Sequence, residues 1–131
     1  MKLPGVIWRT MTGYDLEAVS SIAASVHPDF PESGAVLAER QLLYPHGTYL
    51  LEVNDRPVGY VLSHPWRLGE LPALDTLLGA LPGAADTYYI HDLALLPVAR
   101  RIGAASFIVD ALIKHAAAHG YPTMSLVAVN G

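Results

Sequence analysis

Residues 87–129 carry a pattern that few fold classes can accommodate. Residues 87–96 are almost continuously apolar or aromatic, 103–119 carry apolar residues at helical spacing, and 124–129 are again rich in β-forming residues. A near-continuous apolar run is typical of a strand covered on both faces. A strand–helix–strand unit of this kind places its two strands parallel with a right-handed crossover. The segment therefore predicts an α/β domain built around a buried parallel pair of strands.

Two helices are expected ahead of this segment, because both carry capping residues. Thr12 is followed three residues later by Asp15, which is close to a capping box, and apolar residues then recur at helical spacing. The first helix ends at His27 because the residue before Pro28 avoids the α region. Ser33 is a suitable N-cap for the second helix.

Three further β-rich runs cover residues 6–11, 48–53 and 59–63. Residues 54–57, Asn-Asp-Arg-Pro, favour a turn, so the last two runs predict an antiparallel hairpin. Pro and Gly interrupt residues 65–86, which predicts a long loop with at most one short helix, placed as a lip over a substrate. The element order is then β-α-α-β-β-β-α-β, an α/β fold with a mixed central sheet and helices on both faces. The chain, 1–131, is expected to be a single domain.

Composition excludes several classes of protein. The apolar types make up 52% of the 131 residues and charged types only 15%, against about 25% in an average protein. Such a chain can fold, and its surplus of apolar surface predicts self-association, most simply as a dimer. The net charge is −4, so the chain lacks the excess of basic residues that binds phosphates, and a nucleic-acid partner is not expected.

The cellular compartment is predicted from features that the sequence does not contain. It contains no cysteine and no uninterrupted run of about 18 apolar residues, so neither a disulfide framework nor a membrane span is expected. Residues 1–5 do not resemble a signal peptide. A cytoplasmic protein is the default expectation.

Residues 93–105 are the candidate ligand site. An apolar strand passes through Pro97 into a loop with Arg100 and Arg101, and a long helix then opens at Gly103 with small residues. Unpaired amides and the helix dipole favour an anion at such an N-terminus, and small residues let a phosphate approach the backbone. A tight strand-to-helix turn without a ligand is the structural alternative. Neither a Walker motif nor a Gly-x-Gly-x-x-Gly fingerprint occurs.

At these residues the sequence resembles the GNAT superfamily of acetyl-CoA-dependent N-acetyltransferases. Arg100-x-x-Gly103-x-Ala105 fits the [Gln/Arg]-x-x-Gly-x-[Gly/Ala] signature, and 89–95 resembles the family's fourth strand. The resemblance covers 6–131. It implies that the backbone of the fourth strand pairs with the pantetheine arm of acetyl-CoA and that the loop amides hold the pyrophosphate. The implied cofactor-binding residues are Leu93, Ala94, Leu95, Arg100, Arg101, Ile102, Gly103, Ala104, Ala105, Ser106 and, beyond the last strand, Asn130.

His91 and Asp92 are the catalytic candidates, because acetyl transfer to an amine requires a group that takes the ammonium proton. His91 lies beside the implied thioester, where some family members use a histidine; a histidine satisfied within the core is the alternative. Tyr89 shares the face of His91. Strand alternation places Asp92 on the opposite face, where it would orient or pair another group.

The resemblance implies transfer of acetyl from acetyl-CoA to a primary amine by direct attack in a ternary complex, with a small-molecule or peptide amine as acceptor. Members usually continue with a further helix and strands, and that helix commonly brings a tyrosine acid with no matching position here. These C-terminal elements are therefore expected to be missing, which leaves a non-catalytic CoA-binding or protein-interaction module as the alternative. Such an end would also leave 126–129 as an edge that invites pairing with another chain.

Two other groups of residues are candidate sites. His115 and His119 have metal-capable spacing but no third ligand, so no metal is expected, and two histidines suit the last turn of a helix. His64-Pro65-Trp66 lies at a strand end, where it could line the acceptor pocket.

Overall fold

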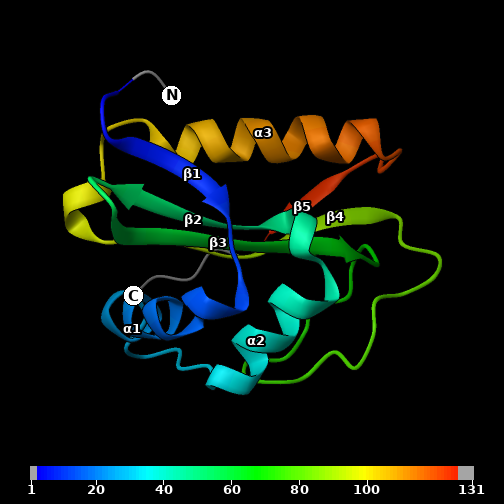
Figure 1. Ribbon diagram of the computed structural model, residues 1–131. Coiled ribbons are helices and arrows are strands. Elements are labelled where there is room, and N and C mark those ends of the chain that lie inside the picture. The colour runs from blue at the N-terminus through cyan, green and yellow to red at the C-terminus, as the bar shows by residue number, and fades with distance from the viewer. Residues whose placement is uncertain (1–2, 127–131) are drawn as a thin grey trace.

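In the described part of the chain, five strands form one mixed sheet in the order β1-β2-β3-β4-β5 (Figure 1). The computed structural model describes residues 3–126. β1 to β4 pair antiparallel in succession, and β5 pairs parallel with β4. The strands are β1 (Val6–Thr10), β2 (Thr48–Val53), β3 (Arg56–Trp66), β4 (Thr87–Leu95) and β5 (Met124–Leu126).

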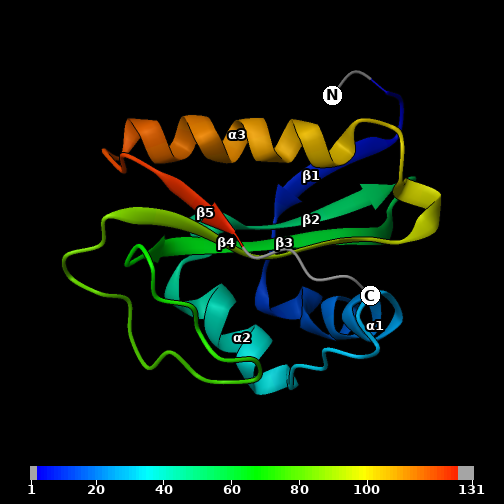
Figure 2. The same ribbon diagram turned by 180° about the vertical axis from the view of Figure 1, so that it is seen from behind.

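Within residues 3–126, three helices cover the sheet, with α3 on one face and α1 and α2 together on the other (Figures 1 and 2). They are α1 (Leu16–Val26), α2 (Gly34–Leu43) and α3 (Ala104–Ala118). Short 3₁₀ turns occur at Gly13–Asp15, Pro45–Gly47 and Pro97–Ala99. The predicted fold class and element order are therefore confirmed.

The predicted capping residues begin both N-terminal helices. Thr12 and Asp15 form the capping box, with the Thr12 amide donating to Asp15 Oδ2 at 2.8 Å, but the box opens a 3₁₀ turn that leads into α1. Ser33 caps α2, since its side chain accepts a hydrogen bond from the amide of Val36. Local sequence thus determines where these helices begin.

The hairpin forms as predicted. Asn54 and Asp55 both have positive φ angles, 51° and 66°, which is the conformation of a type I′ turn and favours Asn and Asp. β3 is longer than the predicted 59–63, because it begins at Arg56 and continues to Trp66. Pro57 is tolerated inside it because the pairing with β2 shifts register at Leu51/Glu52.

The core of the described residues has three clusters: two lie on opposite faces of the sheet, and a third joins Leu51, Val58, Ala99 and Ala104. Apolar residues of α1, α2 and the sheet pack together on one side, and Ile108, Leu112 and Ala116 of α3 pack with Val61, Tyr88 and Ile90 on the other. β4 contributes to both clusters, which agrees with the prediction of a strand covered on both faces. Residues between β3 and β4 form a long loop without a helix.

The predicted edge at 126–129 lies mostly outside the described residues. Leu126 is described and is 61% exposed. Self-association through this strand stays a prediction, and light scattering at high protein concentration tests it. In the described part of the chain, no helix is long and apolar enough to cross a membrane.

Candidate active site

The loop before α3 presents backbone N–H groups without protein partners. Within residues 3–126, the amides of Arg101, Ile102 and Gly103 donate no hydrogen bond, and the first-turn amides of a helix have no intrahelical acceptor. Arg101 and Gly103 have φ angles of 64° and 83°, so the chain turns sharply here. A Cβ on Gly103 would meet nothing within 4 Å, so the space beside it is open. This loop fits a bound pyrophosphate.

Contacts from distant residues fix the position of the loop. Trp8 of β1 donates through Nε1 to the carbonyl of Ala104 at 3.0 Å. The Arg100 side chain donates through Nε to the carbonyl of Leu95 at 3.1 Å, which brings one guanidinium back over the end of β4. Ala104 is buried, whereas Arg100, Arg101, Gly103 and Ser106 are exposed.

The C-terminal half of β4 lies beside this loop. In the described part of the chain, β5 pairs with β4 only at Tyr88, Tyr89 and Ile90, so Leu93, Ala94 and Leu95 extend beyond that pairing. These are the residues whose backbone was predicted to pair with a pantetheine arm. Asn130, the remaining predicted cofactor residue, lies outside the described residues.

A β-bulge in β4 places His91 and Asp92 on the same face of the sheet. Ser63 pairs with Ile90 and Leu62 pairs with Asp92, so His91 is an extra residue in the strand. The prediction that Asp92 lies opposite His91 is wrong, because strict alternation does not continue through a bulge. Tyr89 lies on the same face as His91, as predicted, with ring centroids 6.1 Å apart.

A cavity of about 450 Å³ has His91 and Asp92 in its wall. Part of the lining lies on the α1–α2 side of the sheet, where His27, Phe30 and Glu32 belong to the connection between these helices. Val109 belongs to α3, on the other side. The cavity therefore has lining residues from both sides of the sheet, beside the part of β4 that extends beyond its described pairing with β5. Its other lining residues are Leu71, Pro72, Leu74, Tyr89, Ile90, Leu93 and Leu126.

Glu32 and His91 form a buried pair in this cavity. Nε2 of His91 lies 2.7 Å from Glu32 Oε1, and both side chains are 8% exposed. The amide of Asp75 donates to the other carboxylate oxygen at 3.1 Å. Burial alone would raise the pKa of Glu32, but the hydrogen bond and charge of His91 lower it below its ordinary value. Glu32 is therefore a carboxylate that orients the His91 ring.

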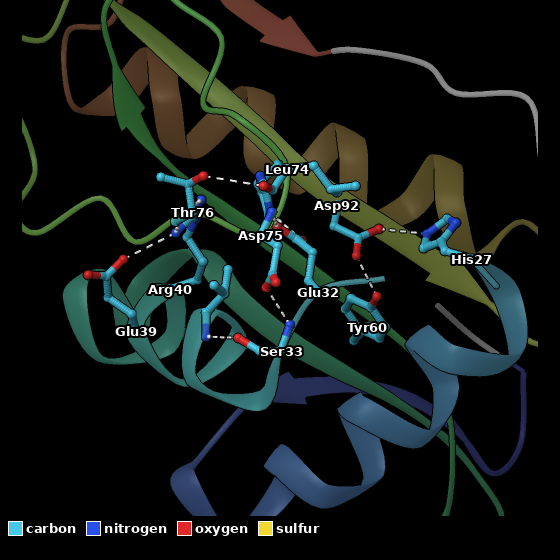
Figure 3. Close-up of polar contacts among 12 residues, drawn as sticks. His27, Glu32, Ser33, Glu39, Arg40, Tyr60, Leu74, Asp75, Thr76 and Asp92 are labelled. Carbon is cyan, nitrogen blue, oxygen red and sulfur yellow. Dashed lines mark hydrogen bonds and ion pairs between the residues drawn. The ribbon is translucent and has the colours of Figure 1, made fainter. Parts of the chain in front are cut away.

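Asp92 forms a second pair with His27 (Figure 3). Its Oδ1 lies 2.8 Å from Nε2 of His27, and its Oδ2 accepts a hydrogen bond from the Tyr60 hydroxyl. The hydrogen bond to Asp92 raises the pKa of His27, although burial opposes it. Burial and Asp92 together raise the pKa of Tyr60. Two adjacent residues of β4 thus each bind a residue of the α1–α2 connection.

The long loop, 67–86, is held against α2 by hydrogen bonds (Figure 3). The amide of Ser33 donates to Asp75 at 2.6 Å, and Arg40 donates to the carbonyl of Thr76. Glu39 accepts hydrogen bonds from the amides of Leu78 and Gly79. These contacts hold Leu71, Pro72 and Leu74 at the cavity wall, and the role of this loop as a lip over a substrate stays a prediction.

Several site residues were missed by sequence reasoning. The sequence pattern marks His27 only as the end of a helix and gives Glu32 and Tyr60 no role. Glu32 and His91 lie 59 residues apart in the sequence. No local sequence pattern predicts a contact between residues so far apart. His64 and Trp66, predicted to line the acceptor pocket, are buried and do not belong to the cavity lining.

The His115–His119 pair is engaged with protein atoms. Nε2 of His115 lies 2.6 Å from the Tyr44 hydroxyl, and Nδ1 of His119 donates to the carbonyl of His115. In the described residues, no group of three or more potential ligands could hold a metal ion.

The family is decided by a match to a family model. The model of the acetyltransferase (GNAT) family matches residues 14–130. The chain belongs to the GNAT acetyltransferase family. A search of the curated proteins found no match.

Solved structures share the fold of this GNAT chain. The loading GNATL domain of CurA from Lyngbya majuscula has a TM-score of 0.71 at 14% identity, covering 86% of this chain and 58% of the CurA domain. The aminoglycoside N-acetyltransferase AAC(6')-Iy in complex with CoA has a TM-score of 0.65 at 13% identity. The match covers 95% of this chain and 77% of that chain. A chain of the NatC complex bound to Gag peptide and CoA has a TM-score of 0.67 at 15% identity. The match covers 92% of this chain and 72% of that chain.

Proposed function

We propose that this GNAT chain transfers the acetyl group of acetyl-CoA to a primary amine by direct attack within a ternary complex. The observation that carries the proposal is the cavity beside β4 that has lining residues from both sides of the sheet. One substrate can approach from the side of α3 and the other from the side of α1 and α2, so that the two meet beside His91. Two of the similar structures contain CoA.

The loop and β4 are assigned to acetyl-CoA. Amides 101–106 would hold the pyrophosphate, with Arg100 and Arg101 adding positive charge, and the backbone of Leu93–Leu95 would bind the pantetheine arm. Bound acetyl-CoA supplies an activated thioester. Open space at Gly103 and unpaired amides in the loop support this assignment.

The Glu32–His91 pair is assigned to the proton of the acceptor. An ammonium has no lone pair and must lose a proton before its nitrogen attacks the thioester carbon. Nε2 of His91 is engaged by Glu32, and Nδ1 is buried without a protein partner. Nδ1 would therefore accept the proton, directly or through water. The carboxylates of Glu32 and Asp92 would also attract the cationic acceptor.

Tyr89 is assigned to the proton that the leaving sulfur needs. Its side chain lines the cavity, and burial raises the pKa of its hydroxyl, so the proton stays on it at neutral pH. The C–S bond breaks as the N–C bond forms, and the thiolate takes the Tyr89 proton. We propose no covalent acetyl-enzyme.

The apolar residues at the lip favour an acceptor with apolar groups beside its amine. Phe30, Leu71, Pro72 and Leu74 all belong to the cavity wall. Small-molecule and peptide amines both fit this description.

A turnover assay tests the proposal. Acetyl-CoA is mixed with the chain and a panel of small amines and peptide N-termini, and release of free thiol is followed. Thiol release that depends on the amine, with acetylated product found by mass spectrometry, is expected. CoA binding without turnover across the panel would instead favour a non-catalytic CoA-binding module, and no CoA binding would exclude both.

A further inference from the structure

Acetyl transfer removes two protons from the nitrogen of an ammonium acceptor. The first must leave before the nitrogen has a lone pair, and the second leaves as the amide forms, while the departing sulfur takes up only one proton. His91, the acceptor assigned above, can hold one of the two. Its Nδ1 is buried, so it has no direct route by which to release that proton to solvent before the other one leaves. The other proton therefore calls for a second acceptor with access to water.

His27 has the position and the exposure that a second acceptor requires. Its side chain lies in the wall of the cavity that also contains His91. Nε2 of His27 lies 2.8 Å from Asp92 Oδ1, and Nδ1 has no protein partner within residues 3–126. The side chain of His27 is 20% exposed, against 8% for that of His91. A proton on His27 can therefore pass to water.

Asp92 and Tyr60 fix the orientation of the His27 ring (Figure 3). The Tyr60 hydroxyl donates to Asp92 Oδ2, and burial raises the pKa of Tyr60, so the proton stays on the hydroxyl. Asp92 is then the acceptor for His27 as well, because a carboxylate has no proton to donate. Nε2 of His27 carries the hydrogen that faces Asp92, and Nδ1 of the neutral ring is the nitrogen that can accept a proton.

The charges around His27 favour proton uptake. Asp92 on β4 and Glu32 in the α1–α2 connection are the charged groups that act on it, and Tyr60 on β3 is neutral. The hydrogen bond to Asp92 raises the pKa of His27 above 6.5, although burial opposes it. A base whose pKa lies near the working pH both accepts and releases a proton efficiently.

We propose that His27 is a second proton acceptor for the transfer reaction, that Asp92 orients it, and that it works beside His91. One histidine takes the proton of the ammonium, and the other takes the proton that the nitrogen loses as the amide forms. The N–C bond forms, the C–S bond breaks, and the sulfur receives one proton from Tyr89. The proton on His91 then replaces the one that Tyr89 gave up, and the proton on His27 leaves to solvent. Nitrogen thus loses two protons, sulfur gains one, and one is released.

Two acceptors are needed only when the amine arrives with its extra proton. Phenethylamine is an ammonium at neutral pH. In β,β-difluorophenethylamine the fluorine atoms withdraw electrons from the nitrogen, so that this amine is largely neutral. The two amines have nearly the same size, and both suit the apolar wall of the cavity. A neutral amine loses only one proton, which His91 alone can accept.

The kcat of wild type and of His27→Gln, measured with both amines, tests the proposal. His27→Gln is expected to lower kcat by about 10²-fold with phenethylamine but by less than about 10-fold with the fluorinated amine. The ratio of variant to wild type, taken for each amine, cancels the difference in their nucleophilicity. Equal losses with the two amines would overturn the proposal, because a purely structural role of His27 slows both reactions alike.

His119→Gln is the matched control for this substitution. His119 is an exposed histidine at the C-terminal end of α3 and does not line the cavity. The variant is expected to keep the kcat of wild type with both amines. A loss in His119→Gln that matches the loss in His27→Gln would overturn the assignment of His27.

Asp92→Asn gives an independent reading, which decides the question if His27→Gln does not fold. It keeps the shape of the side chain but removes the negative charge. The pKa of His27, followed by NMR titration of its ring in the free protein, is therefore expected to fall below that of wild type. The loss of kcat is again expected mainly with phenethylamine. An unchanged pKa of His27, or equal losses with the two amines, would overturn the proposal.

The inference rests on the proposed function, but the two fail in different ways. Acetyl transfer by wild type, with losses in the variants that do not depend on the charge of the amine, would leave the proposed function standing and refute the role of His27. If another alkylamine is the better acceptor, that amine and its β,β-difluoro analogue replace the pair. No amine-dependent release of thiol across the whole panel would refute both.

Discussion

Glu32 and His91 join the α1–α2 connection to β4 through a contact of 2.7 Å between a carboxylate oxygen and Nε2 of the ring. This contact determines which ring nitrogen remains for proton transfer. It also ties the residue assigned as proton acceptor to the segment that lines the acceptor side of the cavity. A carboxylate that orients an imidazole in this way is a recurring arrangement in enzymes that transfer protons.

Glu32→Gln is expected to lower kcat for acetyl transfer by about 10²–10³-fold while leaving CoA affinity unchanged, because the amide cannot stabilise protonated His91. Steady-state kinetics and calorimetry measure the two effects. Glu70→Gln is the matched control, since Glu70 is exposed and pairs only with Arg67 among the described residues. Equal kcat values in the two variants would remove Glu32 from the mechanism.

Gly103→Asp is expected to abolish CoA binding, because it places a carboxylate beside the proposed pyrophosphate site. Gly103→Ala introduces strain of about 1–2 kcal/mol at a φ of 83° but no clash, so binding weakens without disappearing. Gly120→Asp provides the control, since Gly120 has a φ of 80° and open space at the far end of α3. Calorimetry that finds full CoA affinity in Gly103→Asp would exclude this loop as the site.

The His27–Asp92 pair makes stability depend on pH. The pKa of His27 is raised above 6.5 in the folded protein by its hydrogen bond to Asp92, so the folded state holds the proton more tightly. The stabilisation is full below pH 6.5 and is lost as pH rises through the folded-state pKa. In urea denaturation, wild type should exceed His27→Gln in stability most below pH 6.5, with the gap closing above it. A gap that widens with pH contradicts the pairing.

Tyr89→Phe is expected to slow acetyl transfer by about 10²-fold, since the thiolate would leave without a proton from the protein. The loss should shrink with an acyl donor whose thiol is more acidic, such as a thiophenol ester, because that leaving group needs no proton. Tyr49→Phe serves as control, because Tyr49 packs in the α3-side cluster and does not line the cavity. A loss that is the same with both donors would assign Tyr89 a structural role.

The fold could be predicted largely from local signals. Thr12 with Asp15, Ser33, and the Asn54–Asp55 turn each act on neighbouring backbone, and the structure confirms all three. The strand at Thr87–Leu95 followed by α3 was also visible, because the switch from a continuous apolar run to helical spacing occurs within a few residues.

The polar part of the site could not be predicted in the same way. His27 and Asp92 are 65 residues apart, and their contact exists only after α1 has packed on the sheet. The bulge at His91 was also hidden, because it depends on the pairing of β4 with β3 rather than on any residue type in β4. Strict alternation of side chains along the strand therefore predicts the correct face of the sheet for Tyr89 but the wrong face for Asp92.

The bulge in β4 has a consequence for the length of this strand. Removing His91 would restore regular pairing without turning any later residue, because Ile90 already pairs with Ser63 and Asp92 already pairs with Leu62. Leu93 would stay with the α3-side cluster and Ala94 with the cluster beneath α1. The bulge therefore adds one side chain to the cavity wall, and with it the contact to Glu32, at no cost to the packing of the strand on either face. A relative with a regular strand here should keep the same core and have no side chain in the position of His91.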